Sequence, residues 1–458
     1  MTPAQTPERL TDALEENIRL FERIFHSPRN KDLIVRRFET SGFAVCLLYI
    51  EGMAGNELIN EGILKPAMAA PTPQNLVPDQ RAVHLDRNVL NISETQDADQ
   101  VKEMTSAILD GKSVLLVEGD TMALVLETRD YEKRQVDRAQ TESVVIGSQQ
   151  GFVENLRTNL TLIHRIVRTP SLTVEMTTVG TRIPTRVALV YLDGVVNENI
   201  LKEVRRRVRS LHLDFIPDSG QVQALIEDNP ISLIPQILET ERPDRTADCL
   251  CNGQVAVMVD NSPYALIAPI TFFHLLHAAD DSFMRWQYGT FTRLLRSLGL
   301  LISLFLPAIY LSLTTYHAHM IPLDLLTSIA ETRAKVPFPI LVEILILEFS
   351  FYLINEAGTR MPKQIGSALG IVGALILGQA AVSASIISPI LVIIVALTGL
   401  GNYVTPTYSM SLAIQILRFG ILFAAACLGL YGIVLCLFLY LCSLCALTSF
   451  NEPMMAPF

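Results

Sequence analysis

The sequence has few histidines and cysteines, and none of them shows the spacing of metal ligands. The 458 residues include 8 His and 7 Cys. Cys249 and Cys251 lie only two residues apart, which supplies too few donors for structural zinc and poor geometry for a disulfide. We therefore expect no metal site, no cofactor and no disulfide framework.

Catalytic motifs and an excess of basic residues are also lacking. There is no glycine-rich phosphate loop, and Gly147–Gly151 resembles a nucleophile elbow only superficially. We expect no catalytic residue and no enzyme. The 36 basic side chains are outnumbered by 46 acidic ones, so nucleic acid is not an expected partner.

Charge is scarce in the C-terminal third of the chain. Only eleven charged residues lie at or after Ser297, a composition typical of a membrane domain, whereas the preceding part has an ordinary globular composition. This excludes both a purely soluble and a purely integral protein. No apolar run of signal-peptide length lies within Met1–Phe21, so we expect the soluble part on the cytoplasmic side.

Two pairs of segments in the soluble part repeat at one common offset. Val45–Gly52 is echoed by Val187–Gly194, and Gly111–Glu118 is echoed at the same spacing by Gly253–Asp260. Val45–Gly52 and its echo Val187–Gly194 are each predicted to form a strand that a helix follows. Gly111–Glu118 and its echo Gly253–Asp260 are each predicted to begin a β-hairpin. The pattern predicts an internal duplication with two related α/β subdomains.

The expected organisation has four parts. They are an N-terminal tail over 1–30, soluble α/β subdomains over 31–140 and 141–290, and an all-α transmembrane domain over 291–458. On the predicted helix of the second subdomain, Arg205–Arg207 indicates a solvated face or, less simply, a docking site for an acidic partner or lipid headgroups.

The transmembrane domain is predicted to contain five or six helices. Apolar runs occupy 298–316, 340–353, 366–382 and 386–397, and a last run continues from Leu412 to Ser449. At about 1.5 Å per residue the last run is too long for one upright span. It is either a strongly tilted helix or a hairpin that turns near Gly429–Gly432.

Polar and small residues within these runs are candidate functional positions. Glu343 and Glu348 are costly in lipid, so they line an ion path or hydrogen-bond between helices. Gln379 and Ser383 are further pore candidates. Gly366, Gly370 and Gly378 lie at multiples of four residues, which favours close helix packing or a gate. Arg418 is expected only to set membrane depth.

Several ordered segments resemble a known family. They are Thr141–Gly147, Gly151–Asn159, Glu241–Asp244, Leu306–Tyr310, Pro337–Pro339 with Glu343, Glu356–Arg360 and Gly370–Ala381. Together they are similar to the A subunit of GerA-type spore-germination receptors over nearly the whole chain. Tyr352 stands where that family commonly has another acid.

The resemblance implies a nutrient-germinant receptor in the inner membrane of a bacterial endospore. It implies a permease-like B subunit and a lipoprotein C subunit as partners, and contact with membrane lipid. It further implies a homo-oligomeric, pentamer-like ring of A subunits that releases monovalent cations when the complex senses a nutrient. Three alternatives remain: a secondary transporter of a small solute, a non-conducting scaffold subunit, and a paralogue of the family with an accessory role during sporulation.

Overall fold

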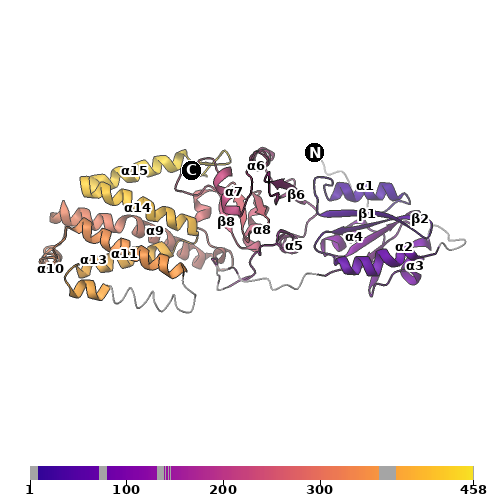
Figure 1. The fold of residues 1–458 in the computed structure, drawn as a ribbon, viewed down its shortest axis with the longest axis horizontal. Helices are drawn as coiled ribbons and strands as arrows, with labels where there is room; N and C mark the ends of the chain where they lie inside the picture. The colour runs from indigo at the N-terminus through magenta and orange to yellow at the C-terminus, as the bar shows by residue number, and fades with distance from the viewer. Residues whose placement is uncertain are drawn as a thin grey trace. The chain divides into compact units, whose positions relative to one another are not determined.

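The computed structural model describes residues 9–71, 80–130, 139, 141–142, 144, 146–360 and 378–456. The chain divides into two compact units (Figure 1). The first comprises Met1–Val144, Ser148–Asp228 and Ile237–Ile270 and is built from α/β structure. The second comprises Val145–Gly147, Asn229–Gln236 and Thr271–Phe458 and is mainly helical.

The first sheet has five strands, each antiparallel to its neighbours, in the order β1-β2-β4-β5-β3. The strands are β1 (Leu33–Thr40), β2 (Phe43–Ile50), β3 (Thr95–Ala98), β4 (Ser113–Val117) and β5 (Ala123–Leu126). Helices α1 (Leu14–Ile24) and α4 (Val101–Leu109) cover one face, and η1 (Leu58–Leu64), α2 (Lys65–Ala69) and α3 (Arg81–Asn88) lie on the other.

Strand β2 shows why both faces must be covered. Its alternate residues are apolar on each side: Val45 and Leu47 face one core, and Cys46 and Leu48 face the other. All four are fully buried. A strand that is apolar on both sides is therefore expected inside the sheet, where helices cover both faces of the sheet.

The second sheet has the same topology, with the order β6-β7-β9-β10-β8. Its strands are β6 (Leu172–Val179), β7 (Thr185–Leu192), β8 (Leu238–Thr240), β9 (Val255–Val259) and β10 (Ala265–Ala268). Its helices are α5 (Leu156–Ile166), α6 (Glu198–Arg209), α7 (Ser219–Ile226) and α8 (Pro243–Cys251).

The predicted duplication is confirmed down to the pairing of individual residues. In the first sheet Val45 lies opposite Val117, and in the second Val187 lies opposite Val259. The spacing from Val45 to Val187 equals the spacing from Val117 to Val259. The two sheets therefore share one register at the strand pair that carries the repeated segments.

The expected N-terminal tail over 1–30 is wrong for the described part. Helix α1 is amphipathic and buries Leu14, Ile18 and Phe21 against the first sheet. Its counterpart at the repeat offset is α5. Asn17 exchanges two hydrogen bonds with the backbone of Thr11, and Asn159 does the same with Val153. The duplicated unit thus begins before residue 31.

In the part of the chain that the structure describes, the helical unit contains six α-helices. They are α9 (Trp286–Thr315), α10 (Leu323–Arg333), α11 (Ile340–Arg360), α13 (Pro389–Tyr403), α14 (Tyr408–Leu428) and α15 (Leu430–Ala446). Strands β11 (Thr448–Ser449) and β12 (Glu452–Pro453) follow. Among the described residues, α9 and α14 are long and apolar enough to cross a membrane, and α13 and α15 are shorter apolar helices. The number of spans stays a prediction.

The last apolar run is a hairpin, one of the two alternatives that its length left open. Helices α14 and α15 meet at Gly429, which has a positive φ of 61°. Next to this turn, a Cβ on Gly432 would overlap the carbonyl oxygen of Ala424. The two helices therefore pack closely because glycine stands at their closest approach.

Candidate functional site

Both acidic pore candidates lie on α11 and are buried inside the helical unit. Glu343 has 0% and Glu348 has 2% of its surface exposed. Their positions, five residues apart on one helix, point them toward different partners. Neither forms an acid pair with the other, so the structure holds two separate polar sites.

Glu343 joins three segments of the helical unit. One oxygen, Oε1, lies 3.3 Å from Nη2 of Arg333, the last residue of α10. The other, Oε2, accepts a 3.1 Å hydrogen bond from the backbone N–H of Ser388, the N-cap of α13. A carboxylate at a helix N-terminus also interacts favourably with the helix dipole.

Glu348 pairs with Arg418 of α14. The distance from Oε2 to Nη2 is 3.3 Å, and Arg418 is only 3% exposed. Arg418 also donates to the hydroxyl of Tyr352, one turn after Glu348, and its guanidinium lies 5.7 Å from the centre of the Tyr352 ring. These three side chains form a buried α11–α14 link.

The expectation that Arg418 only sets membrane depth is therefore wrong. A buried carboxylate is stable only with a charged partner, and Arg418 supplies it. The pairing was missed because the two residues are far apart in the sequence. The available signal was one acid and one arginine, each isolated in an apolar run.

The second set of candidates lies at the start of the last described stretch. Gly366 and Gly370 lie outside the described residues. Gly378 is half-buried, and a Cβ placed on it would meet nothing within 4 Å. Gln379 and Ser383 are exposed on the surface of the single chain. Close glycine packing is seen instead where Gly401 of α13 meets the backbone of Gly299 of α9.

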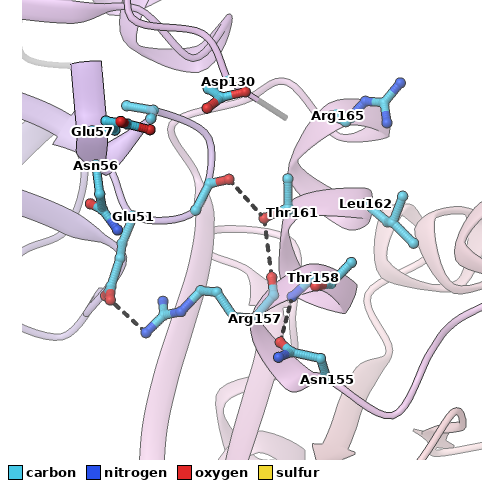
Figure 2. A pocket seen from close by; sticks show the side chains of 13 residues that line it. Glu51, Asn56, Glu57, Asp130, Asn155, Arg157, Thr158, Thr161, Leu162 and Arg165 are labelled. Carbon is cyan, nitrogen blue, oxygen red and sulfur yellow. Dashed lines mark hydrogen bonds and ion pairs between the residues drawn. The ribbon is translucent and has the colours of Figure 1, made fainter. Parts of the chain in front are cut away.

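A cavity of about 360 Å³ lies between the two repeats of the α/β unit (Figure 2). The first repeat contributes the segment from Glu51 to Glu57, and α5 of the second contributes residues from Arg157 to Arg165. The side chains carry both signs of charge. Because the cavity arises only when the repeats meet, no local sequence pattern revealed it.

Arg157 is the centre of the junction beside this cavity. Its guanidinium lies 2.8 Å from Glu51 and 3.3 Å from the buried Asp32. Asp32 also lies 2.9 Å from Nε2 of His164. Thr161 donates to the carbonyl of Gly52, whose φ of 87° suits glycine (Figure 2). The first repeat is thus tied to α5 by several polar contacts.

The arginine run on α6 is engaged in ion pairs within the α/β unit. Arg205 forms two hydrogen bonds with Glu175, and Arg207 reaches Glu203 and Asp228. The hydrogen bond from Arg206 lowers the pKa of Glu203 to about 2, against the opposing effect of its partial burial, and Arg207 adds to the lowering. These pairs favour the solvated-face interpretation over a docking site.

Comparisons with known proteins match almost the entire chain. Residues 19–458 match the family described as Bacillus/Clostridium GerA spore germination protein. The chain is 36% identical to spore germination protein KA of Bacillus subtilis (strain 168), over 99% of this chain and 83% of that protein. It is 39% identical to spore germination protein GerLA of Bacillus cereus, over 81% of this chain and 76% of that protein.

A solved structure matches the N-terminal part. It is the crystal structure of the N-terminal domain of the A subunit of the Bacillus megaterium spore germinant receptor GerK3. The match has a TM-score of 0.46 and 29% identity, and it covers 58% of this chain and 97% of that one.

Proposed function

The chain belongs to the Bacillus/Clostridium GerA spore germination protein family, and from this premise we propose that it is the A subunit of a nutrient-germinant receptor. In this role it forms a homo-oligomeric, pentamer-like ring that acts as a ligand-gated cation channel. The observation that carries the proposal is the family match over residues 19–458, which includes both the α/β and the helical units.

The proposed location and partners follow from the same family membership. The helical unit resides in the spore inner membrane in contact with lipid, with the α/β unit on the spore-core side. The partners are a permease-like B subunit and a lipoprotein C subunit. Helices α9 and α14, which are long and apolar enough to cross a membrane, support membrane residence.

Two kinds of polar residue take different roles in the proposed channel. Glu343 and Glu348 are buried and ion-paired within one chain, which supports the helix-linking role that the sequence left open. Gln379 and Ser383 are exposed on the single chain, so they are available to a water-filled path at the ring centre. We assign the ion path to these two and the protomer's internal links to the acids.

Spores that carry Gln379→Leu or Ser383→Leu test this assignment. We expect slower release of monovalent cations after nutrient addition at an unchanged receptor level, because an apolar side chain removes hydration from the path. Ser328→Leu, at an exposed serine on α10, is the matched control and is expected to behave as wild type. Unchanged release in both pore variants favours a non-conducting scaffold subunit.

A further inference from the structure

An uncharged loop, Asn229–Gln236, leaves the α/β unit and belongs to the helical unit. The side chain of Gln236 closes the loop: its Oε1 accepts from the backbone N–H of Asn229 at 2.9 Å, and its Nε2 donates to the Asn229 carbonyl at 2.8 Å. Ser449 of β11, just after α15, donates to the Gln236 carbonyl. The loop is thus attached to the end of the α14–α15 hairpin.

The loop presents apolar side chains and pairs part of its backbone internally. Ile231 is 90% exposed and Leu233 is 44% exposed. The backbone N–H groups of Ile231, Ser232 and Ile234 all donate within the loop. Its two prolines have no N–H group at all. Each backbone group that is paired within the loop lowers the cost of placing the loop at the membrane interface.

A groove of about 300 Å³ separates the loop from the helices. The loop forms one wall, and Leu417 of α14, Tyr440 of α15 and Leu447, the C-cap of α15, form the other. The hydroxyl of Tyr440 donates to the Leu417 carbonyl, so its polar group is satisfied. What remains open in the groove is mainly hydrocarbon.

The apolar surface continues from the groove along the outside of α15. Leu435, Phe438, Leu439 and Leu441 are exposed on this helix, which packs against the membrane-length α14. A surface that is continuous with an exposed apolar helix and carries no charge matches the membrane interface. It does not match a site for a polar ligand.

We propose that Asn229–Gln236 is a membrane-contacting loop, which inserts Ile231 and Leu233 into the lipid leaflet and holds an acyl chain in the groove beside α14 and α15. The occupant is bilayer lipid. The inference goes beyond the receptor role, because it requires neither a pore nor a germinant.

The test places an environment-sensitive fluorophore at Ile231→Cys in the full-length chain. The background carries alanine at the five accessible cysteines, Cys251, Cys427, Cys436, Cys442 and Cys445. The protein is reconstituted in phosphatidylethanolamine–phosphatidylglycerol vesicles containing a lipid with a nitroxide near the top of its acyl chain. Quenching by this lipid is compared with quenching by aqueous iodide.

Two further labels serve as references. Met68→Cys, at another exposed apolar residue on α2, is the water-side control, and Phe438→Cys on α15 reports lipid contact of the hairpin itself. We expect the Ile231 label to resemble the Phe438 label, with lipid quenching at least twofold above that of the Met68 label and iodide quenching at least twofold below it.

Several outcomes overturn the proposal. Iodide quenching equal to that of the Met68 label places the loop in water. Protection from both quenchers places it against protein, such as a second copy of the chain. If only the Ile231 label escapes lipid quenching, this proposal alone fails. If the Phe438 label escapes it as well, the membrane residence in the proposed function fails too.

Discussion

Glu348 of α11 and Arg418 of α14 form an ion pair with a distance of 3.3 Å between Oε2 and Nη2, and both side chains are 3% exposed. Burial of two charges is costly, but the loss of one partner is costlier because the other charge stays behind unpaired. The pair therefore makes the contact between these helices conditional on both residues.

Removal of one partner from this pair is expected to destabilise the helical unit strongly. Glu348→Ala should lower the free energy of unfolding by about 3–5 kcal/mol, since Arg418 keeps its buried charge. The measurement is thermal unfolding of the full chain in detergent. The double variant Glu348→Leu with Arg418→Met should recover most of the loss, and a single variant as stable as wild type contradicts the account.

The junction between the α/β repeats depends on Asp32, a second buried carboxylate with charged partners. Asp32 is 1% exposed and faces both Arg157 and His164. Asp32→Ala should reduce stability by about 3–5 kcal/mol and speed proteolysis between the repeats. Asp110→Ala, which removes the exposed partner of Arg168, is the control and should cost about 0–1 kcal/mol. Equal effects of the two variants exclude a special role for the junction.

Because α14 and α15 approach closely at one glycine, the effect of a glycine-to-alanine substitution on stability should depend on its position. Gly432→Ala should destabilise by about 1–3 kcal/mol, because its Cβ overlaps the backbone of Ala424. Gly358→Ala on α11 meets nothing within 4 Å and should be neutral or stabilising by up to about 1 kcal/mol. Thermal unfolding of both variants in detergent measures the difference, and similar midpoints refute the packing argument.

The lowered pKa of Glu203 predicts a pH dependence of stability. Its carboxylate has a pKa of about 2 in the folded chain against an ordinary value of 4.5, mainly because of its hydrogen bond from Arg206. The unfolded chain therefore takes up the proton first as the pH falls. The stabilisation is complete above about pH 4.5 and is lost toward pH 2.

Glu203→Gln should flatten the fall in unfolding midpoint between pH 5 and pH 2. Glu198→Gln, in the first turn of the same helix, is the control and should retain the wild-type slope. Circular dichroism melts over this pH range give the midpoints. A slope in Glu203→Gln identical to that of wild type counts against the ion-pair explanation.

The duplicated sheets could be predicted from the sequence. The contacts between residues far apart in the sequence could not. The common offset of the two repeated segment pairs predicted two related sheets because strand periodicity and turn glycines are local signals. The buried start of the first repeat was missed because α1 was judged without its counterpart α5. The Glu348–Arg418 pair and the cavity beside Arg157 were missed because each forms only after distant segments pack together.

In the proposed function, copies of this chain assemble into a ring around an ion path. Native mass spectrometry of the purified, detergent-solubilised chain, with and without co-expressed B and C subunits, tests it most directly. We expect a discrete assembly of about five copies. A monomer in both preparations contradicts the ring and leaves the transporter or scaffold alternatives.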